Sequence, residues 1–138
     1  MRLPSRRILR VEKYVKKILE ANVYAVAIET PLEMAPLLSS RTESEVLLKR
    51  EDMQPIFSFK IRGAYNKISR LTPKAREKGV ITASAGNHAQ GVAMAATTLG
   101  IRSRIVMGEN TPSIKIDAVK AFGGEVILHG DTYDEAAG

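Results

Sequence analysis

Residues 80–107 read VITASAGNHAQGVAMAATTLGIRSRIVM, and this stretch decides the fold. The apolar run at 80–83 predicts a strand, and the small residues after it predict a turn. Residues 87–99 have the length and composition of a helix. We expect that helix to end at Gly100, because glycine readily adopts the left-handed conformation that follows a helix. A further apolar run at 101–107 predicts a second strand, so the order strand, helix, strand predicts a parallel unit.

The same alternation extends along the chain in both directions. The further elements that we expect are an amphipathic helix at 6–20, a short strand at 45–51, a helix at 58–70, a short segment at 74–78, a helix at 113–122, a strand at 125–128 and the start of a helix at 131. Ser58 is the expected N-cap of its helix, because its hydroxyl can accept a backbone hydrogen bond. Together these elements predict an α/β domain with a parallel sheet and flanking helices.

Composition narrows the functional classes. The chain has 138 residues, 44% of them hydrophobic, which suits one domain with a real core. It has no cysteine, which excludes disulfides, thiolate metal sites and a cysteine nucleophile and is compatible with a reducing cytoplasm. Its two histidines, His88 and His129, are too few for a zinc site. No run approaches the ~20 apolar residues of a membrane span, and the basic N-terminus lacks the apolar stretch of a signal peptide.

The net charge is +6, and seven of the 21 basic residues lie in the first 17 positions. A basic N-terminus can bind nucleic acid, but no accompanying aromatic pattern supports that function here. A solvated helix face is therefore the favoured interpretation, and we expect no nucleic-acid partner. A modest positive field also favours small anionic substrates.

Lys60 is the sharpest candidate for chemistry. Phe57, Phe59 and Ile61 flank it, which predicts partial burial and a lowered pKa, because a low dielectric disfavours the charged form. A neutral lysine can form a Schiff base with a carbonyl cofactor. The alternative is a solvated lysine on a helix surface, which is the common case for a lone lysine.

The segment 84–91, SAGNHAQG, is the second candidate. A turn at a helix start offers free backbone N–H groups and a partial positive charge to an anion. Ser84 and Asn87 would add side-chain contacts there. The alternative is that its glycines only serve the turn and the packing, with Asn87 as an N-cap. We expect His88 to be partly buried with its ring bonded to the backbone, and His129 to be structural. Together with a neutral lysine, an anion-binding turn suggests a pyridoxal phosphate enzyme.

Four segments resemble one known family. Residues 49–66, which read KREDMQPIFSFKIRGAYN, resemble the cofactor-lysine segment of biosynthetic threonine dehydratases. Residues 84–91 resemble the asparagine loop of these enzymes, and 114–119 and 122–126 continue the match. The resemblance implies a fold-type II pyridoxal phosphate enzyme, with a fold like that of the tryptophan synthase β subunit.

The resemblance also implies roles for individual residues. Lys60 would hold pyridoxal 5'-phosphate and later remove the Cα proton of the substrate. Phe59 would pack beside the cofactor, and Asn87 would hydrogen-bond its ring hydroxyl. The substrate carboxylate would be held by Ser84 together with backbone N–H groups of Gly86, Asn87 and His88.

The implied reaction converts L-threonine, and also L-serine as a substrate, by dehydration and deamination; threonine gives 2-oxobutanoate and ammonia. It would serve isoleucine biosynthesis or threonine catabolism in the cytoplasm, in a homo-oligomer. His88 and Ala85 favour a dehydratase, because the cysteine synthase branch typically has threonine at the first position and the serine racemase branch has serine at the second. A serine dehydratase, a racemase or a non-catalytic module remain alternatives. Gly108 departs from the family, in which proline is usual.

The resemblance finally implies how the chain is divided. Residues 1–50 would form the N-terminal part of the large catalytic domain, and 51–138 the lysine-bearing helix and a small, truncated βα domain. The phosphate-binding loop and the partner of the pyridine nitrogen would lie beyond residue 138. We therefore expect these 138 residues alone to be inactive.

Overall fold

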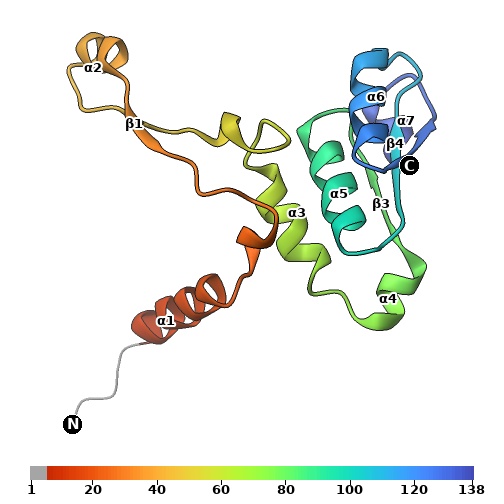
Figure 1. The fold of residues 1–138 in the computed structure, drawn as a ribbon, viewed down its shortest axis with the longest axis horizontal. Helices are drawn as coiled ribbons and strands as arrows, with labels where there is room; N and C mark the ends of the chain where they lie inside the picture. The colour runs from red at the N-terminus through yellow and green to blue at the C-terminus, as the bar shows by residue number, and fades with distance from the viewer. Residues whose placement is uncertain (1–5) are drawn as a thin grey trace.

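The computed structural model describes residues 6–138, with side chains described from Val11 onward (Figure 1). In chain order its elements are α1 (Arg6–Leu19), the 3-10 turn η1 (Val23–Ala25), β1 (Leu32–Met34), α2 (Pro36–Thr42), β2 (Leu47–Lys49), the 3-10 turn η2 (Glu51–Met53), α3 (Lys60–Ile68), α4 (Pro73–Lys78), β3 (Val80–Ala83), α5 (Asn87–Thr98), β4 (Ser103–Met107), α6 (Ser113–Ala121), β5 (Glu125–Leu128) and α7 (Tyr133–Ala137).

A three-stranded parallel sheet, in the order β3-β4-β5, forms the C-terminal part. Thr82 pairs with Ile105 and Ile105 with Val126, so alternate residues of each strand share a face. Helices α5 and α6 pack against this sheet, and Ile105 and Met107 are buried with them. The expected α/β class with a parallel sheet is therefore confirmed, and the predicted strands at 80–83 and 125–128 match β3 and β5.

The opposite face of the sheet is only partly covered. Ile81, Val106 and Ile127 line a hollow of about 510 Å³ on that face, together with Ala136 of α7. Helix α7 contacts β3 and β4. The sheet is thus fully packed on one side and half covered on the other.

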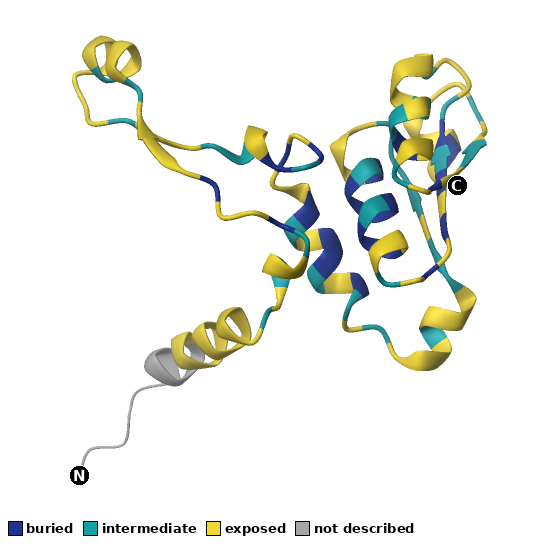
Figure 2. Ribbon diagram, in the orientation of Figure 1, coloured by how far each residue is buried: buried dark blue, intermediate teal, exposed yellow. Residues whose placement is uncertain are grey.

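Helix α3 joins the core through α5. These two helices form the most extensive contact between elements, and they lie side by side in Figure 1. On α3 the buried residues are Ile61, Ala64, Tyr65 and Ile68. On α5 they are mostly small, namely Ala89, Gly91, Val92, Ala93, Ala95 and Ala96. Small side chains bring the two helix backbones close together, and Figure 2 shows the buried surfaces facing each other.

The helix ends agree with those expected from the sequence, except at the N-termini of α5 and α3. Gly100 and Gly123 follow the last residues of α5 and α6 with φ of +66° and +83°, as expected of glycine after a helix. Asn87 is not the N-cap of α5 but its first helical residue, and Gly86 takes the cap position. Helix α3 begins at Lys60, two residues later than expected, and Phe59 takes its cap position. Ser58 still helps to start it, since its hydroxyl accepts a hydrogen bond from the Lys60 N–H at 3.3 Å.

The N-terminal arm, defined here as residues 6–50, packs against α3 at η1, whereas α1 and the β1–α2–β2 part extend away from this core (Figure 1). The strand expected at 45–51 is shorter, at Leu47–Lys49, and it pairs with a strand that the sequence did not indicate. That strand, β1, is antiparallel to β2, and α2 connects the two. Strand β1 was missed because three residues are too few to establish a period.

Apolar side chains of the arm are exposed. Figure 2 shows residues 11–19 of α1 and the β1–β2 ribbon in the colour of exposed residues. They include Tyr14, Val15, Ile18 and Leu19 on α1 and Leu32, Met34, Leu47 and Leu48 on the ribbon. The total accessible surface is 9923 Å², whereas a compact protein of 15.1 kDa exposes about 7,000 Å². None of the described helices is both long and apolar enough to cross a membrane.

Candidate functional site

Lys60 stands at the first position of α3 and is exposed. Its Nζ lies 5.5 Å from the centre of the Phe59 ring, which is close enough for a cation–π contact. The partial burial expected from the apolar flanks is wrong. Of the three flanking residues only Ile61 is buried, because Phe57 and Phe59 turn outward at the helix start. The amine of Lys60 is thus accessible from the solvent.

A strained turn leads into this helix. Phe57 has φ of +55°, which a non-glycine residue rarely adopts, and its N–H donates to the carbonyl of Gln54 at 2.7 Å. Its side chain is 75% exposed, so apolar burial does not offset the strain. Backbone strain of this kind gathers at functional sites, and here it lies three residues before Lys60.

The turn from Ser84 to Asn87 forms the second part of the site. The Ser84 N–H donates to the carbonyl of Val106 at 3.0 Å, which places Ser84 at the carboxyl end of β3. Its hydroxyl accepts a hydrogen bond from the Gly86 N–H at 3.3 Å. The first N–H groups of α5, those of Asn87 and His88, have no acceptor within the helix. This edge therefore presents donors and the positive end of a helix to an anion.

Packing of α3 against α5 brings Lys60 and this helix terminus together. A Cβ built on Gly91, one turn into α5, would lie 3.4 Å from the carbonyl carbon and oxygen of Lys60. The pKa of His88 lies below its ordinary value, first because the surrounding protein partly desolvates the ring and then because the Lys60 charge is near. Two residues expected at one site, Lys60 and His88, are therefore neighbours.

His88 differs from its expectation in two respects. Its side chain is exposed, and within residues 11–138 its ring makes no hydrogen bond to the backbone. The reason is its position in the first turn of α5, where the side chain leaves the helix before the packed face begins. His129 follows β5, and its N–H donates to the carbonyl of Met107 at 2.9 Å, which extends the sheet in keeping with a structural role.

Hollows of different character surround the site. One of about 250 Å³ lies between α3, β3 and α5, with His88, Lys67 and Val92 in its lining. A smaller one of about 100 Å³ lies at the carboxyl edge of the sheet, with Ser84, Asn110 and Tyr133 in its lining. No group of acidic, histidine or cysteine side chains that could hold a metal ion occurs among the described residues.

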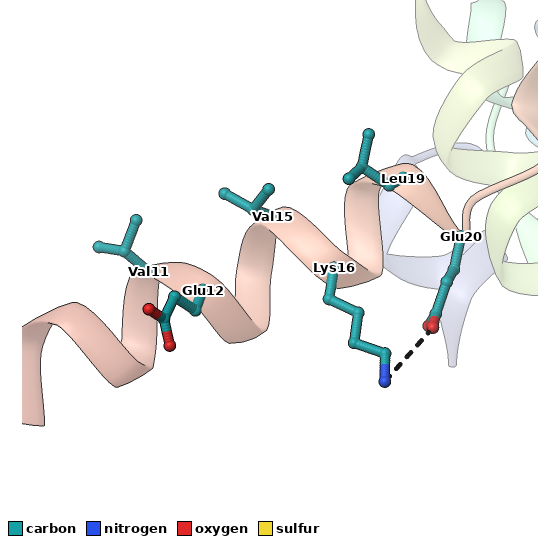
Figure 3. Close-up of a pocket in the computed structure, with 6 residues that line it drawn as sticks. All are labelled: Val11, Glu12, Val15, Lys16, Leu19 and Glu20. Carbon is teal, nitrogen blue, oxygen red and sulfur yellow. Dashed lines mark ion pairs between the residues drawn. The ribbon is translucent and has the colours of Figure 1, made fainter. Parts of the chain in front are cut away.

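A separate hollow lies beside α1 and is unrelated to Lys60. Figure 3 shows Val11, Val15 and Leu19 on one side of α1, with the ion pair between Lys16 and Glu20 on another side. Its lining residues come from this one exposed helix and from Glu20, which directly follows it. It is an uncovered apolar stripe of the arm and not an enclosed site.

Two features near Lys60 escaped the sequence analysis. Glu51 and Arg62 form an ion pair at 2.8 Å that links η2 to α3, and the sequence analysis did not predict that the two residues pair. Gly91 allows α5 to approach the Lys60 backbone, although a glycine within a helix carries no signal of what it contacts. A glutamate eleven positions before an arginine is no recognisable spacing, so only the folded chain shows the pair.

Comparisons with known proteins place these features in context. A family model described as pyridoxal-phosphate dependent enzyme matches residues 24–138. The biosynthetic L-threonine dehydratase IlvA of Pasteurella multocida is 56% identical over 124 residues, which are 90% of this chain and 24% of that protein. This chain thus spans about a quarter of the length of such a relative.

Solved structures give the same result for the fold. The processed form of threonine deaminase isoform 2 from Solanum lycopersicum matches with a TM-score of 0.87 and 55% identity, over 93% of this chain and 35% of that one. Maize serine racemase matches with a TM-score of 0.81 and 34% identity, over 88% of this chain and 37% of that one. The resemblance to threonine dehydratases and the fold-type II class are therefore confirmed.

Proposed function

We propose a function from the family to which this chain belongs, the pyridoxal-phosphate dependent enzymes. The polypeptide that carries this sequence dehydrates and deaminates L-threonine, and it also accepts L-serine. The net reaction turns threonine into 2-oxobutanoate and ammonia; one water leaves with the hydroxyl group and one returns when the amine is released. The observation that carries the proposal is the accessible amine of Lys60 beside the N-terminus of α5.

The residues present fit the cofactor in one respect and the carboxylate of its substrate in another. Lys60 Nζ is exposed on a helix start, so an aldehyde can reach it. The α5 terminus offers N–H donors at the carboxyl edge of the sheet, where an anion is favoured, and a Cβ on Gly86 would meet no atom within 4 Å. Pyridoxal phosphate supplies the electron sink for the chemistry at Cα.

Each site residue then has a defined role, and Lys60 and Asn87 each have two. Lys60 Nζ would hold the cofactor, and its free amine would take the Cα proton of the substrate. Phe59 would flank the cofactor ring, and Asn87 would donate to its ring hydroxyl. The Ser84 hydroxyl and the backbone N–H groups of Gly86, Asn87 and His88 hold the substrate carboxylate. These donors orient the substrate so that the proton faces Lys60, and orientation of this kind supplies much of the rate enhancement of enzymes.

The proposal is tested on the purified full polypeptide, loaded with pyridoxal phosphate, by following 2-oxobutanoate formed from L-threonine. Lys60→Ala should abolish turnover, and Asn87→Ala should lower it by about tenfold or more. Lys74→Ala, which removes an exposed lysine of α4, serves as the matched control and should leave turnover unchanged. Threonine turnover by Lys60→Ala at the normal rate would refute the role of Lys60.

Racemisation is the second candidate, and the likeness to maize serine racemase favours it. A racemase needs a proton donor on the face of the substrate opposite the lysine, and the resemblance points to position 85 for it. Alanine stands there and has no proton to donate. Chiral chromatography of serine after incubation decides the question, since D-serine without ammonia would replace the dehydratase proposal.

Other parts of the proposal concern the rest of the polypeptide. Residues 1–50 are proposed to belong to a large domain and 51–138 to a small one, with the phosphate-binding residues outside this chain. The isolated 138 residues are then expected to be inactive even with added cofactor. We also propose a homo-oligomer in the cytoplasm, in keeping with the exposed apolar arm, and light scattering of the full polypeptide measures its mass.

A further inference from the structure

An ion pair between Glu51 and Arg62 anchors the turn of helix that carries Lys60. Arg62 Nε donates to Glu51 Oε2 at 2.8 Å, and Arg62 Nη2 donates to Glu51 Oε1 at 2.9 Å. The two side chains are only 16% and 24% exposed. Two parallel hydrogen bonds fix orientation as well as distance, which a single contact does not.

Neighbouring groups hold the carboxylate of this pair in place. The buried Thr30 hydroxyl donates to Glu51 Oε1 at 2.6 Å, and Nε2 of the buried Gln54 donates to Glu51 Oε2 at 3.2 Å. The same Nε2 also donates to the carbonyl of Ile28 at 2.8 Å. Hydrogen bonding from Arg62 lowers the pKa of Glu51 to about 2, so the carboxylate stays charged in neutral solution. The anchor is therefore built into the segment before α3 and is not a flexible surface contact.

The ion pair between Glu51 and Arg62 holds α3 on the side of the helix opposite Lys60. An α-helix turns by about 100° and rises about 1.5 Å per residue, so Arg62 points about 200° away from Lys60 and sits about 3 Å further along the axis. Meanwhile α5 approaches the Lys60 backbone at Gly91, and a Cβ there would also meet Ile56 Cδ1 at 3.2 Å. The first turn of α3 is thus held between the ion pair and α5.

We propose that Glu51 and Arg62 are positioning residues for Lys60, because their ion pair sets the rotation and height of the first turn of α3. The inference rests on the proposed function of Lys60. Loss of the pair leaves the amine present but moves it relative to the N-terminus of α5. A displacement of about 1 Å can slow an oriented reaction roughly a hundredfold.

The test uses the full polypeptide and measures cofactor loading separately from turnover. Arg62→Lys keeps the positive charge but loses the fork that binds both carboxylate oxygens. Protein is mixed with pyridoxal phosphate, samples are reduced with borohydride at timed intervals, and the cofactor fixed on Lys60 is counted by mass spectrometry of its peptide. We expect the loading rate at Lys60 to fall about tenfold and its pH profile to shift, with kcat reduced more than KM changes.

The matched control is Arg104→Lys. Arg104 pairs with Glu125 at 3.0 Å on the sheet, but those side chains are 48% and 50% exposed and lie on other elements. Its loading rate should equal that of the unchanged protein. If Arg62→Lys does not fold, the double variant Glu51→Leu with Arg62→Met replaces it, since exchanging both charges for apolar groups often preserves stability.

The outcomes separate the two claims. A folded Arg62→Lys or double variant that loads Lys60 at the normal rate, with a normal pH profile, overturns the positioning role. Failure of the unchanged protein to load Lys60 overturns the proposed function itself. Slower loading in the folded variant, with the Arg104→Lys control unaffected, supports the inference.

Discussion

His88 reports on the charge of Lys60 at the scale of single residues. Its pKa is lowered, first by partial desolvation of the ring and then by the nearby lysine. In the cofactor-free chain we expect its NMR titration midpoint to lie below the ordinary 6.5. Lys60→Met should raise that midpoint part of the way, because the desolvation remains. Lys74→Met, a change of an exposed lysine on α4, should leave it unchanged, and an unmoved midpoint in Lys60→Met would show that the Lys60 charge does not act on His88.

Phe57 stores strain that a single substitution can release. A left-handed conformation costs a residue with a side chain roughly 1–2 kcal/mol, and asparagine tolerates it better than phenylalanine. Because the ring is largely exposed, Phe57→Asn should raise the free energy of unfolding by about 0.5–1 kcal/mol in urea denaturation. Phe57→Ala is the control, since it removes the same exposed ring without asparagine's tolerance of the left-handed conformation, and no gain is expected. Equal gains in both variants would argue against strain at Phe57.

At the scale of elements, two helical glycines should respond oppositely to alanine. A Cβ on Gly63 of α3 meets nothing within 4 Å, so Gly63→Ala should stabilise by about 0.5–1 kcal/mol through helix propensity. A Cβ on Gly91 of α5 meets Ile56 and the Lys60 carbonyl at 3.2–3.4 Å. Gly91→Ala should therefore lose that gain and destabilise by about 1 kcal/mol. Thermal unfolding of both variants compares them directly. Stabilisation by Gly91→Ala would mean that α3 and α5 can move apart enough to accommodate the added methyl group.

Acid should weaken the junction between the arm and α3. Glu51 has a folded-state pKa of about 2 against an ordinary value of 4.5. A carboxylate with a lowered pKa contributes stability above its unfolded pKa and loses it as the pH falls through the folded value. We expect the free energy of unfolding to decline as the pH falls from about 4.5 to 2. In this range the unfolded chain binds up to one more proton at Glu51 than the folded chain does. The decline should be smaller in Glu51→Gln than in the control Glu125→Gln, and equal slopes would contradict the assignment to Glu51.

The whole molecule is more open than its length requires. Its 9923 Å² of accessible surface exceeds the about 7,000 Å² of a compact protein of this mass, and the apolar arm supplies exposed leucine, methionine and tyrosine side chains. A compact chain of 138 residues has a radius of gyration of about 14 Å. Small-angle scattering of the isolated 138 residues, at low concentration, should give a clearly larger value. A value near 14 Å would show that the arm folds back on the core.

Much of the C-terminal fold could be predicted because its signals are local. Strands β3 and β5 match their predicted limits, and α5 ends one residue before the predicted limit, because apolar runs and glycine after helices act over a few residues. The arm was harder to predict. Strand β2 was expected, but its partner β1 and the helix α2 were not, because pairing between distant short segments leaves no period in the sequence.

The site was predicted as a set of residues but not as an arrangement. Lys60 and the turn after β3 were identified by residue type and position, yet the burial expected for Lys60 is absent, since flanking residues in sequence are not neighbours in space at a helix start. The proximity that lets the Lys60 charge act on His88 arises from helix packing over 28 positions, which no local pattern records.

The sequence alone determined the α/β class, the identity of the candidate lysine and the small-residue turn that opens α5, because each depends on interactions within a few positions of the chain. Only the tertiary structure decided that Lys60 is exposed, that Gly91 brings α5 against its backbone, and that Glu51 and Arg62 anchor its turn from behind. These features depend on which surfaces meet when helices and loops pack. They also depend on hydrogen bonds between residues that are far apart in the chain.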